Sequence, residues 1–191
     1  MIHLATKVPE PNRTIRLNEL YANFWHTSQN PSRNFSHRLV RIKKVLKIPS
    51  YYLDIGYSTA NSMFVNRNLY FTTDYQEFEQ TLAQAKALER AGEWAFARKE
   101  YLRAFKLFRG EPFKKMYDQW SKDMRHRILT RLETEAIHFA KCSFEYGNKN
   151  DARKVLEKVL AIIPDSDEIK EMVKGLGTES KKDESAPEIN D

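Results

Sequence analysis

The residues best suited to chemistry in this chain are the basic side chains between residues 31 and 48. This stretch reads PSRNFSHRLVRIKKVLKI and holds six Lys or Arg residues but no carboxylate. Four of its apolar residues follow the spacing i, i+4, i+7 and i+11: Phe35, Leu39, Ile42 and Leu46. This spacing predicts a helix, capped by Asn30 and running to Lys47, that buries one face and leaves cations on the other for anion binding.

The other face of this predicted helix carries side chains that could bind DNA. Five of them cluster away from the apolar stripe on a period of 3.6 residues: Asn34, His37, Arg38, Arg41 and Lys44. In a major groove Arg reads guanine and Asn reads adenine. Near the start of the helix, Ser32 and Arg33 are suited to hold phosphates, and Arg67 could reach a minor groove or the backbone. The alternative is a solvated basic face without a ligand.

Charge is divided unevenly along the 191 residues. Residues 1–74 hold 10 Lys or Arg against 4 Asp or Glu, so the whole net charge of +6 lies there. The remainder of the chain is neutral. A basic part joined to a neutral part indicates that one touches a polyanion and the other touches protein. Double-stranded DNA is the expected polyanion, and RNA binding through the same face is left open.

The elements expected in the basic part follow the order of a winged helix. A first helix is predicted over 17–25, followed by a loop and the basic helix. Short aromatic and β-branched runs then occupy 51–55, 63–65 and 69–72, with turn-prone residues such as Gly56 and Ser58 between them. They predict a small antiparallel hairpin or a three-stranded sheet.

The neutral part is predicted to be entirely helical. The expected helices cover 75–91, 93–108, 116–146, 150–162 and 166–176. Three glycines are expected to end helices: Gly92, Gly110 and Gly147. Two of them begin a weak repeat of small and apolar residues, with Ala97, Tyr101 and Ala104 in one copy and Ala152, Leu156 and Val159 in the other. Such residues let antiparallel helices approach closely, as in tetratricopeptide hairpins.

No pattern of a catalytic site or a metal site emerges. The five histidines are scattered, there is no glycine-rich phosphate loop, and the single cysteine, Cys142, has no cysteine partner. We therefore expect no enzyme activity, no cofactor, no metal and no disulfide. No apolar run is long enough to span a membrane, and a cytoplasmic location is expected. The polar residues 177–191 are expected to form a disordered tail.

Two groups of segments resemble known families. RLNELYANFW (16–25) and RNFSHRLVRIKKVL (33–46) resemble helices of response-regulator-type winged-helix domains. TDYQEFE (73–79), AGEWAFARKEYLRAFKLFRGEPF (91–113) and YDQW (117–120) resemble the bacterial transcriptional activator domain, which is built of tetratricopeptide-like hairpins. The expected fold is therefore mainly α. A truncated winged helix with a small β-hairpin occupies 1–73, and a tetratricopeptide-like helical domain occupies 74–176.

The resemblance implies a DNA-binding transcriptional regulator. The helix over 33–47 would be its recognition helix, and the helical domain would mediate self-association, as a homodimer, or contact with RNA polymerase. In a full winged-helix domain of this kind, a sheet and one further helix precede the two helices predicted here. We expect both to be missing before residue 14. The alternative is a protein-interaction scaffold of tetratricopeptide type whose winged-helix remnant does not bind DNA.

Overall fold

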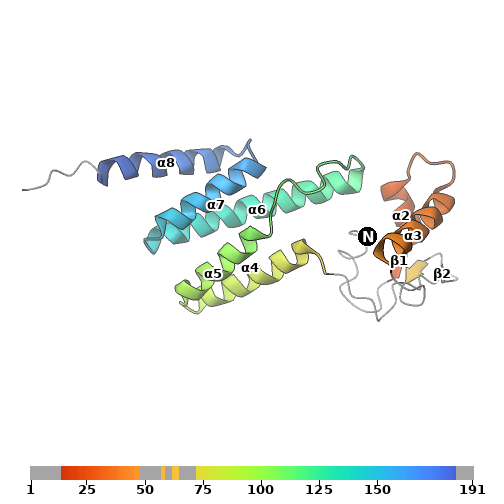
Figure 1. Cartoon of the computed structure of the whole chain (residues 1–191), viewed down its shortest axis with the longest axis horizontal. Coiled ribbons are helices and arrows are strands. Elements are labelled where there is room, and N and C mark those ends of the chain that lie inside the picture. The colour runs from red at the N-terminus through yellow and green to blue at the C-terminus, as the bar shows by residue number, and fades with distance from the viewer. Residues whose placement is uncertain (1–13, 48–56, 59–61, 65–71, 184–191) are drawn as a thin grey trace, which may run out of the picture. The chain divides into compact units, whose positions relative to one another are not determined.

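The computed structural model describes residues 14–47, 57–58, 62–64 and 72–183 of the chain (Figure 1). The chain divides into two compact units. The first comprises Met1–Gln76 with Met116–Lys122, and the second comprises Glu77–Lys115 with Asp123–Asp191. Each unit is described separately below.

The first unit combines two helices with a small antiparallel sheet. Its helices are α2 (Leu17–Phe24) and α3 (Pro31–Leu46). Its strands are β1 (Thr14–Arg16), β2 (Tyr57–Ser58) and β3 (Ser62–Phe64), which pair in the order β1-β3-β2. In this register Ile15 and Tyr57 both lie opposite Met63, so β3 is the central strand.

This sheet differs from the sequence-based expectation in its strands. The expected run 63–65 overlaps β3, whereas the run 51–55 and most of 69–72 lie outside the described residues. Strand β1 was not expected, because three residues next to a helix give too short a pattern to detect. Ser58 was interpreted as a turn residue, but its pairing with Ser62 places it in β2.

Helices α2 and α3 pack through a small aromatic core. Leu17, Leu20 and Phe35 are buried. The ring of Phe35 meets the rings of Tyr21 and Trp25 edge to face, with centroids 6.2 and 6.1 Å apart. Such contacts hold the two helices together beyond the area that they bury.

The second unit consists of helices. They are α4 (Asp74–Arg90), α5 (Trp94–Lys106), α6 (Gln119–Glu145), α7 (Lys149–Ile162) and α8 (Asp167–Asp183). The first residues of α4 and α6 belong to the other unit. Helices α4 and α5 run side by side in opposite directions, as do α6 and α7 (Figure 1). Helices α4 to α7 lie close to their predicted positions and α8 extends beyond its predicted end, and the result is a mainly helical, tetratricopeptide-like arrangement.

The turns of the two hairpins have the same hydrogen-bond pattern. After α4, the N–H of Gly92 bonds to the carbonyl of Glu89, and the N–H of Glu93 bonds to that of Leu88, both at 2.9 Å. After α6, the N–H of Gly147 bonds to Phe144 and that of Asn148 to Ser143. Both glycines have positive φ, 78° and 73°. These are Schellman caps, which end a helix with a left-handed residue.

The residues of the predicted repeat lie in the core of this unit. All six are at most 1 % exposed: Ala97, Tyr101, Ala104, Ala152, Leu156 and Val159. Phe139 of α6 packs its ring against Tyr101 and Phe105 of α5, with centroids 5.5 and 5.6 Å apart. Small and apolar residues at these positions therefore form the contacts between helices, as the repeat predicted.

Two predicted helix ends were wrong. Helix α5 ends at Lys106 rather than at the predicted residue 108, and the ring of Phe108 packs against that of Phe78, with centroids 4.7 Å apart. Gly110 does not have positive φ and caps no helix. At the other end of the unit, α8 continues to Asp183. The polar tail was predicted to begin at residue 177, so its first residues belong to α8. Residues 184–191 lie outside the described part of the chain.

Candidate nucleic-acid interface

Helix α3 has well-formed ends. The side-chain Oδ1 of Asn30 accepts a hydrogen bond from the backbone N–H of Arg33 at 3.2 Å, and Pro31 occupies the first turn. Lys47 closes the helix in the left-handed region, with φ 50°. The predicted cap at Asn30 is confirmed. These ends fix which residues share each face of the helix.

The inner face of α3 is the predicted apolar stripe. Phe35 is 6 % exposed, and Leu39 and Ile42 are half-buried. Packing of Phe35 against α2 sets the rotation of α3 about its axis. The residues on the other side of the cylinder must therefore face away from α2.

The outer face carries the side chains predicted to bind DNA. The exposed members are Ser32, Arg33, Asn34, His37, Arg38, Arg41 and Lys44. The Arg and Lys side chains of α3 form no ion pair with any residue in the described ranges. This segment also lacks a carboxylate of its own. An uncompensated row of cations on a helix is suited to contact phosphates and base edges.

One of the predicted side chains, that of Asn34, also forms a hydrogen bond within the unit. The Nδ2 of Asn34 donates to Oγ of Ser28 at 2.8 Å, and the same oxygen accepts the N–H of Asn30 at 3.1 Å. Ser36 donates to the carbonyl of Ser32 at 3.1 Å. Asn34 thus helps to hold the loop before α3. The cations Arg38 and Arg41 are better placed than Asn34 to meet a ligand.

Two apolar residues of this face were missed by the sequence analysis. Val40 and Val45 are 67 % and 71 % exposed on the same helix as the cations. Their exposure could have been predicted, since both valines fall outside the apolar stripe at i, i+4, i+7 and i+11. In a major groove, exposed methyl groups can contact the methyl group of thymine. The remaining predicted residue, Arg67, lies outside the described residues.

A different cluster of polar side chains lies in the helical unit. His138 and Cys142 occupy successive turns of α6 and face Glu89 of α4, with Nε2 of His138 2.9 Å from Oε1 of Glu89. The histidines were interpreted as scattered and no metal site was predicted, because Glu89 on α4 is distant along the chain from both residues of α6. Burial and the neighbouring Glu89 carboxylate raise the pKa of Cys142 to about 11.

The structure and the comparisons together define the class of the second unit. Paired antiparallel helices with matching caps and small residues at their contacts define a tetratricopeptide-like domain. The family model described as "Bacterial transcriptional activator domain" matches residues 73–173. The chain therefore belongs to the bacterial transcriptional activator domain family, and a general role in transcription regulation follows. The search of curated proteins gave no match.

The segments that carried the resemblance have clear structural roles. Thr73 and Gln76 form a capping box at α4: the N–H of Gln76 bonds to Oγ1 of Thr73 at 3.1 Å, and Oε1 of Gln76 accepts the N–H of Thr73 at 3.0 Å. Asp118 caps α6, with its Oδ1 accepting the N–H of Ser121 at 2.9 Å.

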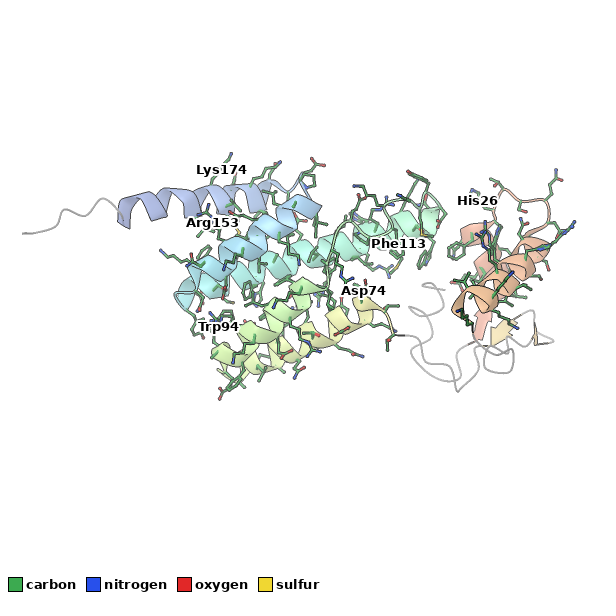
Figure 2. All side chains as sticks on the ribbon, in the orientation of Figure 1. His26, Asp74, Trp94, Phe113, Arg153 and Lys174 are labelled. Carbon is green, nitrogen blue, oxygen red and sulfur yellow. The ribbon has the colours of Figure 1, made fainter. Side chains whose placement is uncertain are left out.

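The connection between α5 and α6 is anchored by one arginine. Arg125 of α6 pairs with Glu111 at 3.2 Å and donates to the carbonyls of Pro112 and Phe113 (Figure 2 labels Phe113). Phe113 has φ 55°, so this segment needs an anchor that holds it in a left-handed conformation. The family-like residues therefore fix the starts of α4 and α6 and the connection between α5 and α6. Among the described helices, none is long and apolar enough to cross a membrane.

Proposed function

We propose that this protein is a DNA-binding transcriptional regulator whose helix α3 enters the major groove. The observation that carries the proposal is the outer face of α3, where Arg33, Arg38, Arg41 and Lys44 are exposed. In this account α2 and α3 act as a helix-turn-helix, and the short strands belong to a wing. His37, Ser32 and Arg33 would contact the backbone or base edges beside the two central arginines.

The distribution of charge supports DNA as the ligand. The net charge of +6 lies in residues 1–74, and the rest of the chain is neutral. A protein that neutralises phosphates with Lys and Arg releases counterions, which supplies much of the binding free energy. The exposed valines add groups that could distinguish thymine from other bases.

Charge reversal on α3 tests this proposal. The variant Arg38→Glu with Arg41→Glu should lose at least about 100-fold in affinity for a fluorescent duplex, because two contacts become repulsive. The binding is measured by fluorescence anisotropy in low salt. Both side chains are exposed, so circular dichroism should show that the fold is unchanged.

A matched control separates a local effect from a change in net charge. Lys154 and Lys174 are exposed on α7 and α8. Lys154→Glu with Lys174→Glu changes the net charge equally and should retain most of the affinity. Equal losses in both double variants, or no binding by the folded wild-type protein, would contradict a role for α3.

The helical unit has surface features that favour contact with protein. Phe96 of α5 and Tyr146, which directly follows α6, are 56 % and 55 % exposed. Tyr146 stacks on Trp94, labelled in Figure 2, with centroids 4.9 Å apart. Arg98 pairs with Asp151 at 3.0 Å, so the start of α5 and the start of α7 lie together. Exposed aromatic residues at this end suit an interface with a second copy or with RNA polymerase.

This second role is tested independently of DNA. The variant Phe96→Ser with Tyr146→Ser should shift a self-associating protein towards monomer in analytical ultracentrifugation, while DNA affinity per monomer is retained. If the protein associates but never binds DNA, the scaffold alternative is favoured.

A further inference from the structure

We propose that Glu89, His138 and Cys142 form a binding site for a divalent cation of the zinc type. Glu89 lies on α4, and the other two residues lie on successive turns of α6. One donor atom from each of the three residues lies within 4.8 Å of the others. The site is independent of DNA binding and involves no residue of α3.

The distances between the donor atoms fit one metal ion. Oε1 of Glu89 lies 2.9 Å from Nε2 of His138 and 3.5 Å from Sγ of Cys142, and the two α6 atoms are 3.7 Å apart. Metal–ligand distances of about 2.0–2.3 Å at near-tetrahedral angles separate neighbouring donors by about 3.3–3.7 Å. The three atoms can therefore occupy one face of a tetrahedron with small side-chain movements.

The donor chemistry selects the ion. Zn²⁺ is bound by thiolate, imidazole nitrogen and carboxylate oxygen, whereas Ca²⁺ and Mg²⁺ prefer oxygen ligands alone. Three protein ligands leave a fourth position, which water can fill because the His138 side chain is 41 % exposed. Binding requires Nε2 of His138 to present its lone pair with the proton on Nδ1, and the Cys142 thiol to release its proton to solvent as Sγ binds.

A buried tyrosine orients the carboxylate. Tyr101 of α5 is fully buried and donates from Oη to Oε2 of Glu89 at 2.6 Å. This bond occupies one carboxylate oxygen and leaves Oε1, the atom nearest to His138 and Cys142, for the metal. Hydrogen bonds of this kind fix ligand orientation in metal sites. Tyr101 is thus a positioning residue.

Cobalt substitution tests the site directly. Co²⁺ added to the reduced, metal-free protein should give thiolate-to-cobalt charge-transfer absorption and bind as one ion per chain. Cys142 is the only cysteine, so any such band must arise from it. Zn²⁺ should abolish the band by competition, and it should raise the midpoint of thermal unfolding.

Variants determine whether the predicted partners take part. Cys142→Ser should remove the band, and His138→Gln and Glu89→Gln should each weaken Co²⁺ binding by at least about tenfold. Tyr101→Phe should weaken binding by about tenfold while keeping the band. His126→Gln, an exposed histidine on the same helix, is the control and should bind normally.

Three results would overturn the proposal. One is the absence of a thiolate band in folded protein, which would leave only a hydrogen-bonded cluster. Another is a stoichiometry of half an ion per chain, which would indicate a cation held between two copies through Cys142. The third is a wild-type spectrum and affinity in the folded His138→Gln and Glu89→Gln variants.

Discussion

Glu135 is the charged residue that is buried in the described part of the chain, at 1 % exposure. Its Oε1 lies 2.6 Å from Nζ of Lys86 on α4 and 2.7 Å from Nη1 of Arg131 on α6. The two cations remain 29 % and 37 % exposed. The carboxylate thus depends on its partners for compensation, whereas the cations can be rehydrated without it.

This asymmetry gives a prediction for stability. The variant Lys86→Met with Arg131→Met should lower the free energy of unfolding by about 3 kcal/mol, because a buried carboxylate is left uncompensated. Glu135→Gln should cost only about 1 kcal/mol, because water replaces the lost partner of each cation. Urea unfolding followed by circular dichroism measures both values.

The exposed, unpaired Lys154 provides the control. Lys154→Met should change the unfolding free energy by no more than about 0.5 kcal/mol. If Glu135→Gln were as costly as the double cation variant, the proposed asymmetry would be wrong.

The site residues were predictable to different extents. Arg38 and Arg41 could be placed on the outer face of α3 because helical periodicity and one apolar stripe determine the direction of every side chain. The bond from Asn34 to Ser28 could not be foreseen, since it depends on the loop conformation. The proximity of Glu89 to His138 could not be predicted from their spacing along the chain, because it depends on how two helices pack.

The two hairpin turns show how short sequence signals set helix ends. Gly92 and Gly147 have positive φ, and no atom outside the glycine and its two chain neighbours lies within 4 Å of the position that a Cβ would occupy. An alanine at either position would therefore be destabilising only because of its left-handed backbone conformation, and not because of a steric clash.

We expect Gly92→Ala and Gly147→Ala each to lower the unfolding free energy by about 1 kcal/mol. Gly175→Ala, within α8, should instead raise it by up to about 1 kcal/mol, because alanine favours helix. Chemical denaturation of the three variants provides the comparison. Neutral effects at Gly92 and Gly147 would show that the left-handed caps contribute nothing to stability.

Long helices were predicted more accurately than short strands, because a longer periodic pattern of apolar residues is easier to detect in the sequence. The long helices α4 to α7 carry several turns of periodic residues and were placed closely. The predicted end of α5 lay at residue 108, slightly beyond its actual end at Lys106, because periodicity does not register a tertiary contact such as that of Phe108 with Phe78. The two- and three-residue strands give almost no period, so β1 was missed.

The molecule as a whole joins a basic unit to a neutral helical unit of the bacterial transcriptional activator domain family. The charge asymmetry could be predicted directly from the sequence, and it supports the proposed role of α3 in DNA binding. The winged-helix interpretation is a proposal that variants of α3 test.

The most direct test is the salt dependence of DNA binding. For contacts made by the six cations of residues 31–48, we expect log Kobs to fall with log [salt] with a slope of about −5, since each phosphate contributes about −0.9. Arg38→Gln and Arg41→Gln should each reduce the magnitude of this slope by about 1, and Lys154→Gln should leave it unchanged. A slope that is near zero, or that does not respond to Arg38 and Arg41, would contradict the account.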